Sequence, residues 1–225
     1  MISGPDVRFY GRRKGHDLKP GRQRLVNEAL PLLRLPDTLP QNLSDLFAKE
    51  VDEVQLEIGF GAGEHLVHQA LNHARVGYIG AEPYINGVAA LVAAIEREKV
   101  ETIRIFDEDA RLLLPRLPDA SLTKIFLLFP DPWHKARHNK RRFVSEETLD
   151  HFARLIKPGG EFRFASDDAG YVRWTLARTT RHPDFIWTAT GPDDWRTRWP
   201  DAMATRYETK NITKLKPAYL SFRRR

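Results

Sequence analysis

The sequence LEIGFGAGEH, residues 56–65, places a glycine-rich turn directly after an apolar run with the character of a buried strand. Gly59, Gly61 and Gly63 let the backbone turn sharply and approach a ligand without a Cβ atom in the way. In an open, mainly parallel sheet, such a turn lies at the carboxyl end of the first strand, where ligands bind. The stretch therefore predicts the first strand of a parallel sheet and one wall of a ligand site.

Strand-like segments recur along the whole chain on both sides of this turn. They are short runs rich in β-branched and aromatic residues, bounded by turn residues. The predicted strands are residues 52–58, 76–82, 102–106, 123–129, 161–166, 184–190 and 218–224. Helical segments fall between them. This alternation predicts an α/β, Rossmann-like fold with a seven-stranded, mainly parallel sheet and helices on both faces.

Two of the intervening helices have clear signals in the sequence. Residues 84–98 have one apolar stripe at helical spacing, made of Tyr84, Val88, Leu91, Val92 and Ile95. Residues 145–156 form the second helix: Ser145 is a suitable N-cap, acidic residues follow it, and Pro-Gly-Gly at 158–160 ends it.

Length and composition restrict the architecture further. A chain of 225 residues is long enough for one substantial α/β domain and too short for two of typical size. We expect one domain over residues 21–225, after a basic arm, residues 1–20, whose polar composition is typical of segments that are disordered when unbound. The sequence has no cysteine, no membrane-length apolar run and no secretory signal, which favours a cytoplasmic location.

Charge is distributed unevenly, although the net charge is only +6. Residues 8–24, 134–142 and 206–225 contain 19 of the 36 Lys and Arg but only two of the 30 Asp and Glu. Clustered cations bind polyanions through the release of counterions, so the pattern favours a nucleic acid as partner. The alternative is that the basic tails are solvated and only aid solubility.

Acidic residues lie in or after the first three predicted strands. Glu82 ends the second strand about 20 residues beyond the glycine turn, where a carboxylate accepts both hydroxyls of a ribose. Glu57 lies inside the first strand, which is unusual unless a cation binds nearby; the alternative is an edge residue that points to solvent. Asp109 follows the third strand, where it either accepts a hydrogen bond from an adenine amino group or caps a helix. Together these carboxylates predict a nucleoside site.

The spacing of the glycines narrows the choice of nucleoside. A dinucleotide fingerprint needs its third glycine at the position of Glu64, which argues against a nicotinamide or flavin cofactor. S-adenosylmethionine has no pyrophosphate, and its ammonium and sulfonium groups suit an acidic site. We therefore expect this compound to be the cofactor.

A second stretch, FPDPWHKARHNKRR, residues 129–142, joins a rigid turn to a run of cations. Pro130 and Pro132 fix the backbone on either side of Asp131 and remove competing amide donors. The alternative for Asp131 is an ordinary turn residue. The cations after this turn are suited to the phosphates of a polynucleotide.

His134 and His138, four residues apart in the same stretch, raise the question of a zinc site. No acidic or cysteine ligand accompanies them, so we expect no metal. Both are instead expected to be neutral donors near the phosphates.

The longer stretch KIFLLFPDPWHKARHNKRR, residues 124–142, resembles the central motif of the bacterial tRNA (guanine-N7-)-methyltransferases, which are class I enzymes that use S-adenosylmethionine. The resemblance covers nearly the whole chain. It includes FYGRRKGH at 9–16, LEIGFGAGEH at 56–65, FRFASDD at 162–168 and TRYETK at 205–210. It implies methyl transfer to N7 of a guanine in tRNA, at position 46 of the variable loop.

The resemblance also implies roles for individual residues. Asp131 is implied as the catalytic residue. Cofactor binding is implied for Glu57, Gly59, Gly61, Gly63, Glu82, Asp109 and Asp131. Substrate binding is implied for Lys135, Asp167, Thr205, Arg206, Tyr207 and Glu208. RNA binding is implied for Arg137, His138, Asn139, Lys140, Arg141 and Arg142.

The sequence departs from the family pattern at a few positions. It has Glu64-His65 where an aromatic or aliphatic residue is common, and Asp168 beside Asp167. It has Asn211 where the family usually places a glycine, and an insertion-like stretch at 191–203. The central motif is undisturbed.

Chemistry supports the same interpretation of Asp131. Guanine N7 already exposes a lone pair, so its methylation needs no base, only alignment and favourable electrostatics. A carboxylate beside the ring stabilises the positive charge that develops there and accepts hydrogen bonds from N1–H and the exocyclic amine. Phe129 and Trp133 are expected to stack on the base.

Two other classes of function stay open at this point. An RNA-binding module without catalysis explains the basic segments but not the acidic strand ends. A methyltransferase acting on an exocyclic amine is the nearest enzymatic alternative, but such sites usually have two prolines before the aromatic residue, whereas one separates Asp131 from Trp133. The sequence does not decide between a monomer and a homodimer.

Overall fold

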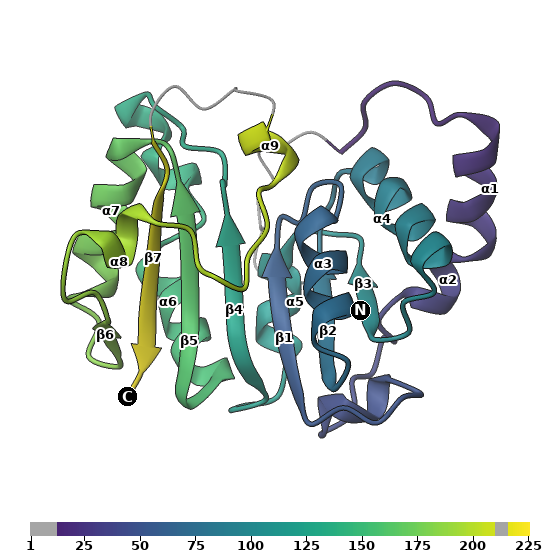
Figure 1. Cartoon of the computed structure of the whole chain (residues 1–225), viewed down its shortest axis with the longest axis horizontal. Helices are drawn as coiled ribbons and strands as arrows, with labels where there is room; N and C mark the ends of the chain where they lie inside the picture. The colour runs from purple at the N-terminus through teal and green to yellow at the C-terminus, as the bar shows by residue number, and fades with distance from the viewer. Residues whose placement is uncertain (1–12, 210–215) are drawn as a thin grey trace.

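The computed structural model describes residues 13–209 and 216–225, and its centre is a seven-stranded sheet (Figure 1). The strand order is β3-β2-β1-β4-β5-β7-β6. Strands β1 to β5 are parallel, and β7 runs antiparallel to both of its neighbours. The predicted fold class is thus confirmed. The strands are β1 (Glu53–Ile58), β2 (Val76–Ala81), β3 (Ile103–Phe106), β4 (Leu122–Leu128), β5 (Ile156–Ser166), β6 (Phe185–Trp187) and β7 (Ala218–Arg224).

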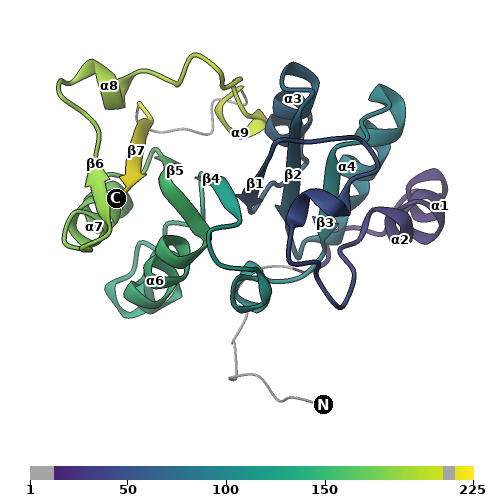
Figure 2. The ribbon, with the colours of Figure 1, turned by 90° about the horizontal axis from the view of Figure 1, so that it is seen from below.

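Helices pack on both faces of the sheet, α3 and α4 on one and α5, α6 and α7 on the other (Figure 2). Helix α1 packs on the outside of α4. The α-helices are α1 (Pro20–Glu28), α2 (Leu30–Leu33), α3 (Glu64–Asn72), α4 (Ile85–Glu98), α5 (Ala110–Leu113), α6 (Glu146–Leu155), α7 (Ala169–Thr179), α8 (Asp193–Arg196) and α9 (Arg206–Thr209). Short 3-10 helices are η1 (Leu43–Leu46), η2 (Leu114–Arg116) and η3 (Ala136–Arg141).

The helix signals in the sequence have direct structural counterparts. Val88, Leu91 and Val92 of the predicted stripe are fully buried between α4 and the sheet. Tyr84, the first member, is instead the N-cap residue and lies half-buried in a cavity wall. Ser145 caps α6 as predicted, because its side chain accepts a hydrogen bond from the backbone N–H of Thr148.

Strand β5 begins earlier than the sequence predicted. The Pro-Gly-Gly at 158–160 lies inside β5 rather than after a helix, because α6 already ends at Leu155. The pairing of β4 with β5 shifts in register between Leu122 and Lys124. A Cβ on Gly160 would lie 2.6 Å from the carbonyl oxygen of Thr123, so only glycine fits beside β4 there.

Strand β6 is shorter than the predicted 184–190, because the chain makes its last hydrogen bonds to β7 at Thr188 and then turns toward α8. The following stretch, 191–203, crosses the face of the sheet that carries α3, over the strands β7, β5 and β4 (Figure 1). Trp199 is buried and donates its indole N–H to the hydroxyl of Ser221 at 2.9 Å. The insertion-like stretch is therefore a packed layer over the part of the sheet that α3 and α4 leave uncovered.

Part of the predicted basic arm lies against the start of α4. Ile85 donates its backbone N–H to the carbonyl of Arg13, and Gly15 donates to the side chain of Asn86 at 2.9 Å. Residues 1–12 of the arm lie outside the described part of the chain. Among residues 13–209 and 216–225, no helix has the length and apolar character to cross a membrane.

Candidate active site

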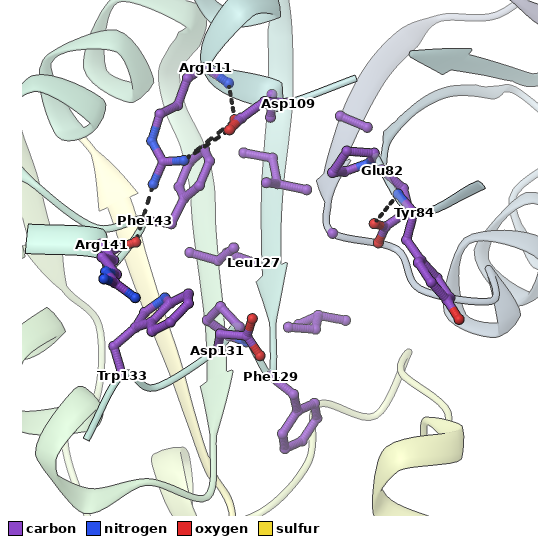
Figure 3. Close-up of a pocket in the computed structure, with 17 residues that line it drawn as sticks. Glu82, Tyr84, Asp109, Arg111, Leu127, Phe129, Asp131, Trp133, Arg141 and Phe143 are labelled. Atoms are coloured by element: carbon purple, nitrogen blue, oxygen red, sulfur yellow. Dashed lines mark hydrogen bonds and ion pairs between the residues drawn. The ribbon is translucent and has the colours of Figure 1, made fainter. Parts of the chain in front are cut away.

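Two adjoining cavities, of about 550 and 430 Å³, open at the carboxyl ends of the parallel strands. Gly59, Leu128 and Phe129 line both of them. The larger cavity is bounded by the ends of β1, β2 and β4 and by the start of α5 (Figure 3). This is the edge at which the sheet topology predicts ligand binding.

The glycine turn after β1 has the predicted sharp geometry. Gly59, Gly61 and Gly63 have φ angles of 72°, 57° and 80°. Gly59 and Gly61 line the cavities, and a Cβ on either would meet no atom within 4 Å, so their surroundings are open. Gly63 is buried against Leu91 of α4, so it packs the turn against that helix. Gly87, in α4, is also closely packed against this turn, since a Cβ there would lie 2.2 Å from the carbonyl oxygen of Gly61.

Glu82, at the end of β2, is tied to the glycine turn. Its carboxylate accepts the backbone N–H of Gly61 at 3.0 Å and that of Tyr84 at 2.9 Å. Burial raises the pKa of Glu82, although these two N–H groups oppose the shift. The negative charges of Asp131 and Glu57 raise it further. The cavity is therefore a site of concentrated negative charge that favours a cationic ligand.

Glu57 is buried in β1, at the centre of the sheet, and lines the smaller cavity. The alternative of a solvent-facing edge residue is wrong, because β1 has a strand on each side. Its Oε2 lies 2.8 Å from Nδ1 of His65 in α3. The position of Glu57 in the sequence predicts a cation nearby, but it does not predict His65 as the neighbour of Glu57 within the protein.

Asp109 lines the larger cavity and also caps α5. Its Oδ1 accepts the backbone N–H of Arg111 at 2.9 Å, and its Oδ2 pairs with the Arg111 guanidinium at 3.1 Å. The capping alternative is thus confirmed, while contact with adenine stays a prediction.

Asp131 is exposed and lines the larger cavity together with Glu82 and Asp109 (Figure 3). Its loop is strained on both sides, since Phe129 and Trp133 have φ angles of 50° and 48°, a region that non-glycine residues seldom adopt. Such strain persists only where the surrounding structure holds it in place.

Arg142 is one of the groups that hold this loop. It is 8% exposed, and its Nε donates to the carbonyl of Pro132 at 2.9 Å. Its guanidinium lies about 5 Å from the ring centroids of both Tyr171 and Trp174. Arg142 therefore does not lie on the surface with the other cations of its run, and the geometry gives it a structural contact with the loop of Asp131.

The other cations of the run lie in or beside η3, next to the cavity. Lys135, Arg137 and Lys140 are exposed, and Arg141 lies 5.0 Å from the ring centroid of Trp133. Asn139 and His138 are half-buried in the same turn. Partial desolvation and then the charges of the neighbouring arginines lower the pKa of His138, so it is neutral at pH 7.

Three of the predicted substrate-binding residues, Asp167, Thr205 and Tyr207, lie together beside Phe129, whereas Lys135 lies in the loop before η3. Tyr207 packs against Phe129, with ring centroids 5.4 Å apart, and donates its hydroxyl to Asp167 at 3.2 Å. Thr205 and Tyr207 line the smaller cavity. The side chain of Arg206 lies outside the described part of the structure.

Glu208, in contrast, is occupied within the protein. It accepts hydrogen bonds from Thr205, Arg198 and Tyr219. Burial alone would raise the pKa of Glu208, but these bonds lower it, so the side chain is a stable anion. Its contacts hold the 205–208 segment in place.

Asp168, a departure from the family pattern, has a structural explanation. It is the N-cap of α7, and its carboxylate lies 3.0 Å from Nδ1 of His134. This contact ties the loop after Asp131 to α7. Among the residues described, no group of three or more His, Asp or Glu side chains is arranged to hold a metal ion.

Comparison with known proteins gives related sequences and folds. A protein-family model described as "Putative methyltransferase" matches residues 52–220. The chain is 52% identical to a tRNA (guanine-N(7)-)-methyltransferase of Rhodospirillum rubrum, over 98% of this chain and 89% of that protein. It is 50% identical to the Brucella anthropi protein of the same name, over 96% and 94%. A solved "Structure of an Antibiotic Related Methyltransferase" is similar in fold alone, with a TM-score of 0.54, 14% identity, and coverage of 85% of this chain and 96% of that one.

Proposed function

Because the chain belongs to the tRNA (guanine-N7-)-methyltransferase family, we propose that it transfers a methyl group from S-adenosylmethionine to N7 of a guanine in tRNA, at position 46 of the variable loop. The observation that carries the proposal is that Glu82, Asp109 and Asp131 line one cavity beside a run of exposed cations. The acidic cavity suits a cationic nucleoside, and the cations suit a polynucleotide.

The residues in the two cavities fit S-adenosylmethionine. Glu57 is 3% exposed, and its Oε1 has no hydrogen-bond partner within the described chain, so it is suited to the ammonium group. Gly59 and Gly61 leave open space for the chain between ammonium and ribose. Glu82 would accept the ribose hydroxyls, and Asp109 the adenine amino group. When bound, the cofactor supplies an electrophilic methyl group on a sulfonium.

Asp131 would act on the base that receives the methyl group. Its exposed carboxylate is free to accept hydrogen bonds from N1–H and the exocyclic amine of guanine, a donor pair that adenine lacks. The same negative charge stabilises the positive charge that develops on the purine ring. No proton has to be removed from N7. The contribution of the protein is therefore alignment and electrostatic stabilisation.

The surroundings of Asp131 would hold the nucleotide in place. Phe129 and Trp133 flank the aspartate and offer aromatic surfaces for stacking. The substrate-binding set is Lys135, Asp167 and the segment 205–208.

The exposed cations Arg137 and Lys140, with Arg141, His138 and Asn139, would contact the RNA backbone. Because N7 of this guanine takes part in the tertiary fold of tRNA, the base has to be drawn out before it reacts, and the cations would hold the RNA meanwhile. We expect this to occur in the cytoplasm.

The product of the reaction tests this proposal against its alternatives. The protein is incubated with S-adenosylmethionine and unmodified bulk tRNA, and the nucleosides are analysed by mass spectrometry. We expect 7-methylguanosine, and we expect it to disappear when position 46 of a single tRNA is changed from guanine to adenine. N2-methylguanosine or a methyladenosine would indicate a methyltransferase of another specificity. The absence of any methylated product would leave an RNA-binding module.

A further inference from the structure

A chain of hydrogen bonds leads away from Glu57 into the protein. Nδ1 of His65 lies 2.8 Å from Oε2 of Glu57, and the two side chains are 2% and 4% exposed. Gln69, one turn further along α3, places its side-chain nitrogen 3.3 Å from Nε2 of His65 and 2.7 Å from the carbonyl oxygen of Asp201. The chain of bonds thus joins β1, α3 and the 191–203 stretch.

The partners in this chain determine where the protons are. A backbone carbonyl only accepts, so the Gln69 atom facing Asp201 has to be the amide nitrogen. The second hydrogen of that nitrogen is available to Nε2 of His65, which therefore accepts, and the ring proton is on Nδ1. His65 is then a neutral imidazole that donates to Glu57. Oε2 of Glu57 accepts this hydrogen bond.

A neutral donor is well suited to this position. A buried carboxylate without a partner is costly and tends to bind a proton, which would remove its charge. An arginine or lysine in place of His65 would neutralise the carboxylate and compete with a cationic ligand. The imidazole stabilises the anion and leaves its charge for the ligand.

We propose that His65 and Gln69 are positioning residues that keep Glu57 ionised, with Oε1 available to the ammonium group of the cofactor. The inference rests on the proposed function, because it assumes that the ligand of Glu57 is that ammonium. It also gives the 191–203 stretch a role, since the carbonyl of Asp201 fixes the orientation of Gln69. The carboxylate of Asp201 is itself anchored by Arg163 at 2.7 Å.

A purely structural role for His65 has to be distinguished from this one. The imidazole also packs edge-on against Phe126, with centroids 4.9 Å apart. If packing were its only role, a substitution would disturb the whole cavity and weaken every ligand equally. If His65 acts through Glu57, only ligands that carry the ammonium group lose affinity.

Two ligands separate these outcomes in a calorimetric titration. S-adenosylhomocysteine carries the amino-acid group, whereas 5′-methylthioadenosine has the same nucleoside without it. We expect His65→Leu to weaken S-adenosylhomocysteine about tenfold, as for loss of a hydrogen bond to a charged group, and 5′-methylthioadenosine less than about twofold. His65→Asn keeps an N–H donor and should restore most of the difference. His68→Leu, on the same helix and outside the cavity walls, is the matched control.

Each outcome decides a different claim. Equal losses for both ligands, or a failure of His65→Asn to recover, would overturn the role of His65 while leaving the cofactor assignment intact. If the unaltered protein bound 5′-methylthioadenosine and S-adenosylhomocysteine equally well, the assignment of Glu57 to the ammonium would itself be wrong. Gln69→Leu should give the same selective loss to a smaller extent, and it replaces His65→Leu if that variant does not fold.

Discussion

The two sides of the site that the adjoining cavities form differ in how their charged groups are held. On the side formed by β1, β2 and β3, Glu57, Glu82 and Asp109 are wholly or mostly buried, and each is hydrogen-bonded within the protein. On the side formed by the loop after β4, Asp131 and two cations of η3, Arg137 and Lys140, are exposed. The first side is organised before any ligand arrives, whereas the second presents charged side chains to solvent.

This difference separates the expected effects of substitutions. A change on the organised side should alter affinity for the cofactor, because these groups are already positioned to bind it. A change on the exposed side should alter the rate of methyl transfer or the affinity for tRNA. Substitutions on each of the two sides test that separation.

The largest effect is expected at Asp131. We expect Asp131→Ala to lower the rate of methyl transfer about 10²- to 10³-fold, because it removes the charge beside the developing cation. Asp131→Asn keeps the size and one hydrogen-bond acceptor, so it should retain more activity. Single-turnover assays at saturating cofactor and tRNA measure both. A rate within about threefold of the unaltered protein would rule out a catalytic role.

Gly87→Ala tests the organised side without changing a charged group. The added Cβ would lie 2.2 Å from the carbonyl oxygen of Gly61, so the glycine turn or α4 has to move. We expect affinity for S-adenosylmethionine to fall about tenfold to a hundredfold, because overpacking of this kind costs about 1–3 kcal/mol. Gly21→Ala is the control, since its Cβ would meet nothing within 4 Å. Both variants are titrated with S-adenosylmethionine. Equal affinities would contradict the claim that the cofactor site depends on the close approach of Gly87 to Gly61.

Arg142 and Arg137 test whether cations of one basic run have different functions. Arg142→Leu removes the bond to Pro132 beneath the Asp131 loop, so we expect about a tenfold lower rate with little change in tRNA affinity. Arg137→Leu should instead weaken tRNA binding and reduce the slope of its salt dependence by about one. The rate of methyl transfer and the affinity for tRNA, measured by filter binding across a salt series, distinguish the two variants. If Arg142→Leu changed the salt slope as Arg137→Leu does, Arg142 would contact a phosphate of the RNA, and its assignment to the support of the Asp131 loop would be wrong.

A smaller effect concerns pH. The raised pKa of Glu82 means that it gains a proton before the pH has fallen to 4.5, its ordinary value. Ribose hydroxyls donate to the ionised form, so cofactor affinity should be full at neutral pH and fall as the pH drops through the raised pKa. The effect on folding stability has the opposite sign. Because the pKa of Glu82 is raised, the folded state binds this proton more tightly than the unfolded state does. The stabilisation that results is lost as the pH rises through the raised pKa. Glu82→Gln should bind more weakly and with less dependence on pH in the same titrations.

The positions of the acidic residues on the organised side could be predicted from the sequence. The side chains that hold them in place could not. That Glu82 and Asp109 line one cavity could be predicted because strand ends of a parallel sheet meet at one edge, which follows from topology alone. His65 was not identified as the partner of Glu57, because the glycine turn between them changes the direction of the chain. No helical or strand period relates the two positions.

The exposed side shows a similar limit. The sequence of 134–142 predicts one basic surface, since nothing in it distinguishes one cation from another. Arg142 differs only because Tyr171 and Trp174, on a helix about 30 residues further along, enclose it. The start of β5 and the length of β6 were also misplaced, because they depend on pairing with β4 and β7 rather than on local composition.

The affinity of Asp131→Ala for S-adenosylmethionine tests the separation of the two sides most directly. It is measured by calorimetric titration in the absence of tRNA. Because the cofactor side is organised by its own hydrogen bonds, the affinity should stay within about twofold of the unaltered protein, although methyl transfer is largely lost. An affinity that falls in proportion to the rate would show that Asp131 belongs to the cofactor side, and would contradict the account.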